Sequence, residues 1–179
     1  MWNIGPHRLA SRLLLGTRHY PNLDVMAAVH LHSGTGMVTL PIRAFTEQPT
    51  TTEMIIDHID RSSVLIVPST AGCFTSEDAI STANMASELL ETRWIKLTIH
   101  GCARTMFLDM EGTLEAAREL VKEGFYVLPS CTDDPVLCER LADIGCVAVL
   151  PLSAAQDSGR GLANPRRLEL IRYAVSIPM

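Results

Sequence analysis

The chain has 179 residues, of which 47% are hydrophobic, and a formal net charge of -5 at pH 7. This length and apolar content predict a single folded domain, residues 1–179, and exclude an intrinsically disordered chain. The acidic balance argues against binding to nucleic acid or to an anionic membrane surface.

Short apolar runs alternate with amphipathic helical patterns along the chain. We predict strands at residues 12–16, 37–42, 64–67, 94–99, 125–128 and 147–150, with a seventh beginning at Ile177. Helices are predicted between them at residues 23–31, 52–59, 75–90, 112–122, 135–144 and 165–173. Asp134 and Asn164 each precede a proline, which is typical of a capped helix start. Strict alternation of strand and helix implies a parallel sheet with right-handed crossovers.

The number of strand–helix units limits the architecture. A barrel of eight units needs at least about 200 residues, whereas this chain holds six units and the start of a seventh strand. The pattern therefore leaves two alternatives, an open doubly wound sheet or a barrel that is incomplete at its C-terminus.

The cysteine spacing and the N-terminal sequence indicate the cellular compartment, and the cysteine spacing argues against a zinc site. Five cysteines occur without CxxC or zinc-ligand spacing, so we expect reduced thiols, no metal and no cofactor in a cytoplasmic protein. Residues 1–15 lack the pattern of a signal peptide, and no apolar run approaches the about 20 residues that span a bilayer.

Lys96 interrupts the apolar run 94–99 and is the strongest candidate for chemistry. A lone ammonium in a buried strand is costly unless it is paired, hydrated or neutral. A neutral lysine is a nucleophile that forms Schiff bases with carbonyl substrates. The alternative is a lysine whose head reaches solvent at the strand end. Strand alternation places Trp94, Lys96 and Thr98 on one face, which points inward in a barrel.

Loops at the carboxyl ends of the strands are the expected ligand sites in both architectures. Gly159 and Gly161 lie before a helix start, which is typical of a phosphate cradle, although such turns often only join elements. The polar loop 68–75 and Asp133 are further candidates, with helix capping as the alternative for the loop.

These segments resemble the ThiG family, the bacterial thiazole synthases of thiamin biosynthesis. The similar segments are residues 11–17, 68–75, 94–97, 113–151 and 158–165, which include Cys131-Thr132-Asp133-Asp134-Pro135-Val136-Leu137. The resemblance implies a (β/α)8 TIM-barrel fold, here truncated after about six units and the start of strand seven. It also implies a homo-oligomeric transferase that uses no cofactor.

The resemblance further implies the reaction and the site. The family condenses 1-deoxy-D-xylulose 5-phosphate with dehydroglycine and with sulfur from the thiocarboxylate of a small sulfur carrier protein. The lysine that forms the imine corresponds to Lys96. The implied substrate and phosphate contacts are Gly159, Gly161, Asp157, Ser158 and Thr70.

The chain also departs from the family at several of these positions. A family glutamate corresponds to Thr98, a family asparagine to Ser69, and a family glycine to Asp157, whose carboxylate would repel a phosphate. Two alternatives to thiazole synthase therefore stay open: a catalytically inactive fragment that acts as a binding or assembly module, and another Schiff-base lyase of the aldolase kind.

Overall fold

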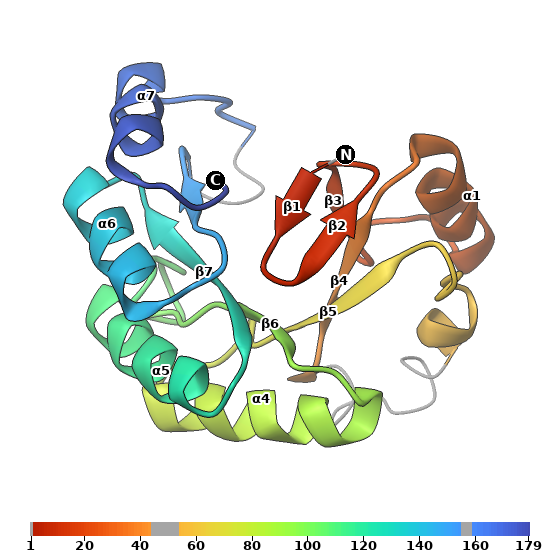
Figure 1. The fold of residues 1–179 in the computed structure, drawn as a ribbon. Coiled ribbons are helices and arrows are strands. Elements are labelled where there is room, and N and C mark those ends of the chain that lie inside the picture. Colours follow the sequence, from red (N-terminus) through yellow and green to blue (C-terminus); the bar gives the residue numbers. More distant parts are fainter. Residues whose placement is uncertain (1, 44–53, 155–158) are drawn as a thin grey trace.

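The computed structural model describes residues 2–43, 54–154 and 159–179 (Figure 1). Six parallel strands form one sheet in the order β3-β4-β5-β6-β7-β8. The strands are β3 Leu14–Gly16, β4 Met37–Pro41, β5 Leu65–Ser69, β6 Trp94–Leu97, β7 Tyr126–Thr132 and β8 Leu150–Leu152. Each strand thus pairs with the next strand of the sheet in chain order, as in a barrel.

The helices cover the outer face of this curved sheet (Figure 1). They are α1 Leu23–Ser33, α4 Ser76–Leu90, α5 Met110–Lys122, α6 Pro135–Ile144 and α7 Pro165–Ala174, and residues 54–57 are also helical. The sheet curls into half of a (β/α) barrel whose open side lies between α1 and α7. The incomplete barrel, rather than the flat doubly wound sheet, is therefore the architecture.

The two faces of the sheet bury different sets of side chains. On the outer face, Ile95, Leu97 and Ile99 pack with Ala116 and Leu120 of α5 in one fully buried cluster. Full burial of such a side chain contributes about 1.5–3 kcal/mol. A separate cluster fills the amino-terminal half of the concave face and includes Met37, Val67, Trp94 and Leu128.

An antiparallel hairpin of β1 Trp2–Ile4 and β2 His7–Leu9 closes the amino-terminal end of the half-barrel. Ile4 is 1% exposed within the concave-face cluster. Gly5 turns the hairpin at a φ of +50°, and a Cβ added there would lie 3.2 Å from Cγ1 of Val147. The hairpin was not predicted, and it acts as a plug under the concave face.

Several element bounds differ from those predicted. The strand expected at 147–150 is observed at Leu150–Leu152, because the backbone N–H groups of Val147 and Val149 bond to Val127 and Pro178 outside the regular ladder. The Pro178 bond places the segment beginning at Ile177 beside β8. β7 runs on to Thr132, while β6 ends at Leu97. The first two residues of the helix predicted at 52–59 lie outside the described residues.

None of the helices in the described ranges is long and apolar enough to cross a membrane.

Candidate active site

Lys96 lies on the concave face of β6, just beyond the apolar layer that the hairpin closes. Its neighbours in register are Ser69 of β5 and Leu128 of β7. Its strand neighbours Ile95 and Leu97 are fully buried on the opposite face, so the alternation predicted from the sequence holds here. Lys96 is half-buried, and no residue in the described ranges forms an ion pair or hydrogen bond with its Nζ atom.

Burial lowers the pKa of Lys96 from its ordinary value of 10.5. Desolvation penalises the ammonium, and none of the carboxylates in the described ranges pairs with it. A larger fraction of the amine is therefore neutral at physiological pH than on a surface lysine. A neutral amine beside an apolar wall is suited to attack a carbonyl carbon.

Burial keeps the thiols of Cys73 and Cys146 in their neutral, less nucleophilic form. Desolvation raises the pKa of Cys146 to about 12 and also raises the pKa of Cys73. All five cysteines are free, as the sequence predicted. Within the described part of the chain, no three His, Cys, Asp or Glu side chains gather to hold a metal ion.

Small hydroxyl groups lie beside Lys96, at Ser69, and above it toward the carboxyl ends of the strands, at Thr98 and Ser130. Oγ1 of Thr98 is 2.9 Å from Oγ of Ser130 on β7. Oγ of Ser69 accepts a hydrogen bond from the backbone N–H of Ala71 at 3.2 Å. Ser69, Thr98 and Ser130 are at most 5% exposed. They form a polar layer between Lys96 and the carboxyl ends of the strands, the end that we call the mouth.

Thr70 joins β5 to β6 through its side chain. Its hydroxyl donates to the carbonyl oxygen of Thr98 at 2.9 Å and accepts from the Thr98 N–H at 2.8 Å. Its own N–H donates to the carbonyl oxygen of Lys96 at 3.1 Å. The hydroxyl proton is therefore committed to the backbone, and phosphate binding by Thr70 stays a prediction.

The segment before α7 leaves open space at its two glycines. Gly159 and Gly161 adopt φ values of +65° and +63°, which favour glycine, and a Cβ added at either would meet nothing within 4 Å. The loop leads to Asn164, whose Oδ1 accepts from the N–H of Arg167 and caps α7. Asp157 and Ser158, also predicted to contact substrate, lie outside the described residues.

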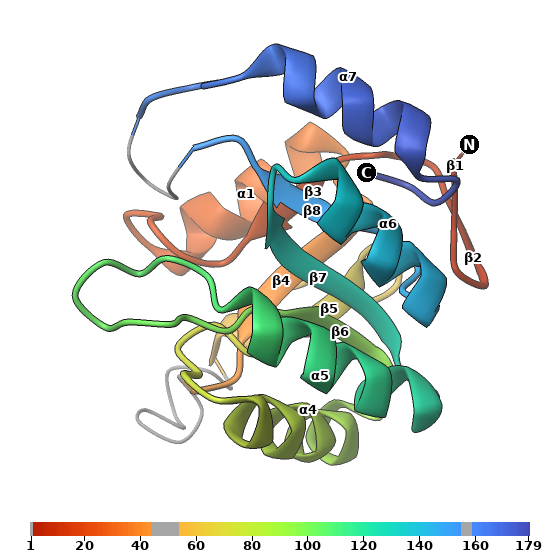
Figure 2. The same cartoon turned by 90° about the vertical axis from the view of Figure 1, so that its left-hand side faces the viewer.

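The loops that follow β3, β6 and β8 project from one side of the half-barrel (Figure 2). The predicted phosphate loop and the mouth above Lys96 therefore belong to the same end of the sheet. Asp133, a further candidate at this end, pairs with Arg167 of α7 at 3.0 Å, while Asp134 caps α6. Neither carboxylate is a free acid or base.

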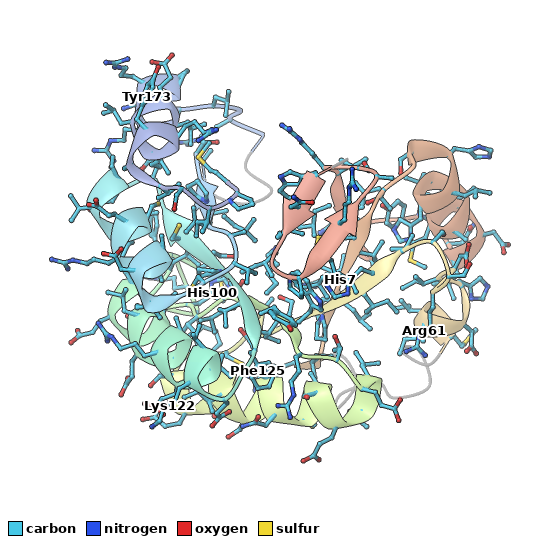
Figure 3. The ribbon with its side chains drawn as sticks, in the orientation of Figure 1. His7, Arg61, His100, Lys122, Phe125 and Tyr173 are labelled. Carbon is cyan, nitrogen blue, oxygen red and sulfur yellow. The ribbon has the colours of Figure 1, made fainter. Side chains whose placement is uncertain are left out.

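His100 is the residue at this mouth that sequence reasoning missed. It follows β6, its neighbour Ile99 packs in the outer cluster with α5, and it is 8% exposed. Figure 3 labels His100 together with His7, which lies on β2 at the opposite, amino-terminal end. Continued alternation from Lys96 through Thr98 was the signal that pointed to it.

Comparison with known proteins relates the chain to thiazole biosynthesis. The sequence model of the family described as thiazole biosynthesis protein ThiG matches residues 3–179. A thiazole synthase of Myxococcus xanthus is 44% identical over 170 residues, which are 95% of this chain and 65% of that protein. A thiazole synthase of Aquifex aeolicus is 43% identical over 176 residues, which are 98% of this chain and 66% of that protein. The chain thus spans about two thirds of the length of these relatives.

Solved structures share the fold. A chain of the BexX/CysO complex of Amycolatopsis orientalis superposes with a TM-score of 0.84 at 26% identity, covering 98% of this chain and 72% of that one. The YdjI aldolase of Escherichia coli K12 superposes with a TM-score of 0.60 at 14% identity, covering 92% of this chain and 62% of that one. The second likeness shows the barrel fold alone.

Proposed function

The chain belongs to the ThiG family of thiazole biosynthesis proteins, and on this premise we propose that it acts as a thiazole synthase. The proposed reaction forms the thiazole phosphate of thiamin from 1-deoxy-D-xylulose 5-phosphate, dehydroglycine and a sulfur carrier thiocarboxylate. The curated relatives are thiazole synthases of which this chain spans about two thirds.

The observation that carries the proposal is the half-buried Lys96 on the concave face, whose Nζ atom has no partner within residues 2–43, 54–154 and 159–179. Its neutral amine attacks the ketone carbon of the sugar phosphate, and water leaves as the imine forms. Leu128 beside Lys96 and Trp94 below it exclude water from the lower side. The phosphorylated end of the sugar is proposed to lie toward the carboxyl ends of the strands.

The lysine content of the chain makes this proposal specific. The sequence contains two lysines, Lys96 and Lys122. Lys122 ends α5, its side chain is 78% exposed, and it lies 3.6 Å from Glu119. An exposed amine on the outer helical layer cannot serve a site on the concave face, so Lys96 is the side-chain amine available to it.

The sugar phosphate is proposed to lie with its phosphate at the loop that contains Gly159 and Gly161. Two glycines at positive φ leave room for an anion to approach backbone N–H groups, and the amino end of α7 follows. A sulfur carrier is proposed to deliver sulfur at the same end, and the BexX/CysO complex is a precedent for a two-protein assembly on this fold.

A reconstitution experiment tests the proposed function. The chain is supplied with 1-deoxy-D-xylulose 5-phosphate, dehydroglycine and carrier thiocarboxylate, and the thiazole phosphate is measured by mass spectrometry. We expect product from the natural chain and from Lys122→Arg, and none from Lys96→Arg. Equal product from Lys96→Arg would overturn the assignment.

One observation favours a second function, an inactive binding or assembly module. β3 and β8 are the edge strands of the six-strand sheet. Edge strands carry unpaired N–H and C=O groups that pair readily with another chain. A folded chain that associates with copies of itself or with a sulfur carrier, yet makes no product in the reconstitution, would support this second function.

A further inference from the structure

On the concave face, Lys96 has no free carboxylate near it among the described residues. An imine makes the C–H bonds next to it acidic, and a positioned base must take that proton. The resemblance places a glutamate where this chain has Thr98, and the Thr98 hydroxyl bonds to Ser130. Asp133 and Asp134 at the mouth are engaged with Arg167 and with the α6 backbone.

His100 lies two residues beyond Thr98 on the same side of the strand. Ile99 between them is fully buried in the outer cluster with α5, so the flanking side chains point the other way, toward the mouth. The backbone N–H of His100 donates to the carbonyl oxygen of Cys73, which ties it to the loop after β5. The centroid of the Phe74 ring lies 6.0 Å from the centroid of the imidazole.

The hydrogen bonding of His100 fixes which ring nitrogen is basic. Nδ1 lies 3.1 Å from the carbonyl oxygen of Met106, and because a carbonyl only accepts, Nδ1 carries the proton. The neutral imidazole therefore has its lone pair on Nε2, for which the described residues provide no hydrogen-bond partner. Such an imidazole is oriented as a general base.

We propose that His100 is the general base for the Lys96 imine in this chain, in place of the glutamate that Thr98 has replaced. This inference rests on the proposed function. Nε2 takes a proton from a carbon next to the iminium carbon, the C–H electron pair forms a C=C bond, and the iminium nitrogen becomes a neutral enamine. Return of the proton from Nε2 reverses the step, so the atoms and electrons balance without an oxidant or reductant.

The spacing of the two residues suits a substrate held between them. Four residues along a strand separate their Cα atoms by about 13 Å. The long stem of Lys96 and the imidazole of His100 span part of this distance from the same face. The remaining gap is filled by the sugar carbons attached to Nζ, so the base reaches carbon rather than the amine itself.

Hydrogen–deuterium exchange of the substrate tests the proposal. The full chain is mixed with 1-deoxy-D-xylulose 5-phosphate in D2O, and deuterium at the carbons flanking the ketone is followed by NMR. Borohydride trapping on a parallel sample reports imine formation separately. His100→Asn is the informative variant because its amide N–H is placed to keep the bond to Met106 while the basic nitrogen is lost.

We expect His100→Asn to trap the imine like the natural chain. Its deuterium exchange should be slower than that of the natural chain by a factor of at least about 100. Thr98→Glu added to His100→Asn should recover exchange. His58→Asn is the matched control, because Nδ1 of His58 also bonds to a backbone carbonyl, that of Met54 at 2.7 Å, away from the mouth.

The remaining outcomes separate the possible failures. Exchange at the natural rate in His100→Asn would overturn the role of His100 as base. Loss of imine trapping in His100→Asn would show that the residue only maintains the structure, and would overturn it as well. A natural chain that traps no imine would refute the proposed function itself and this inference with it.

Discussion

Replacing Thr70 with valine tests whether this hydroxyl holds the two strands beside the candidate site. Beyond the β5–β6 ladder, the Thr70 hydroxyl is the partner of both the N–H and the carbonyl oxygen of Thr98. Valine has nearly the same shape, so the change removes the hydrogen bonds and leaves packing intact. It also buries two backbone groups of Thr98 without partners.

The expected loss follows from those two groups. An unsatisfied buried donor or acceptor costs about 1–3 kcal/mol, so Thr70→Val should lower the free energy of unfolding by about 2–4 kcal/mol. Thr70→Ser keeps the hydroxyl and removes one methyl group, at a cost of about 1 kcal/mol. Thr70→Ser should therefore be more stable than Thr70→Val, although an apolar side chain usually gives the more stable protein at a fully buried position.

Urea unfolding followed by circular dichroism measures both values from the midpoint and slope. Because the Thr70 hydroxyl holds Thr98, two residues beyond Lys96, Thr70→Val should slow imine formation more than Thr70→Ser does. A Thr70→Val variant as stable as Thr70→Ser would refute the structural role of the hydroxyl. Phosphate binding would then be the role that remains for Thr70.

Three further predictions follow from burial and charge. The folded state depresses the pKa of Lys96 below 10.5, so the unfolded chain holds the extra proton just below pH 10.5 and Lys96 contributes a rise of stability with pH there. The buried thiols of Cys73 and Cys146, whose pKa values are raised, contribute the opposite slope, so chemical denaturation should show a less positive or more negative slope in Lys96→Met than in the natural chain; equal slopes would contradict the assignment. Ile4→Ala should cost about 2–5 kcal/mol, because Ile4 is buried under the concave face; a smaller shift in thermal unfolding would show that the hairpin is not a plug. Asp157→Gly should tighten sugar-phosphate binding by about 1 kcal/mol by removing like-charge repulsion, and calorimetry showing unchanged or weaker binding would count against the predicted site.

Much of the half-barrel was predictable because its signals are local. Apolar runs and helix caps mark each unit, and Asp134 before Pro135 does cap α6, accepting from the Val136 N–H at 2.9 Å. The alternation that placed Lys96 on the concave face is also local, because the Cβ atoms of a strand point to opposite faces in turn.

The missed elements depend on contacts between distant segments. The hairpin strands are three residues each, too short to show a period, and their stability comes from Ile4 packing on Trp94 and Leu128. β7 continues through Pro129 to Thr132, although proline and polar residues argue against a strand, because Leu97 and β8 flank it. The role of Thr70 depends on the tertiary pairing with Thr98, which no local pattern contains.

The central claim is that Lys96 forms an imine with the ketone of 1-deoxy-D-xylulose 5-phosphate. Borohydride reduction of that mixture, followed by peptide mass spectrometry, identifies the amine that carries the sugar. With two lysines in the sequence, the readout distinguishes the peptide that contains Lys96 from the one that contains Lys122. The account predicts the adduct on Lys96 and its absence in Lys96→Arg; an adduct on Lys122, or one that persists in Lys96→Arg, would contradict it.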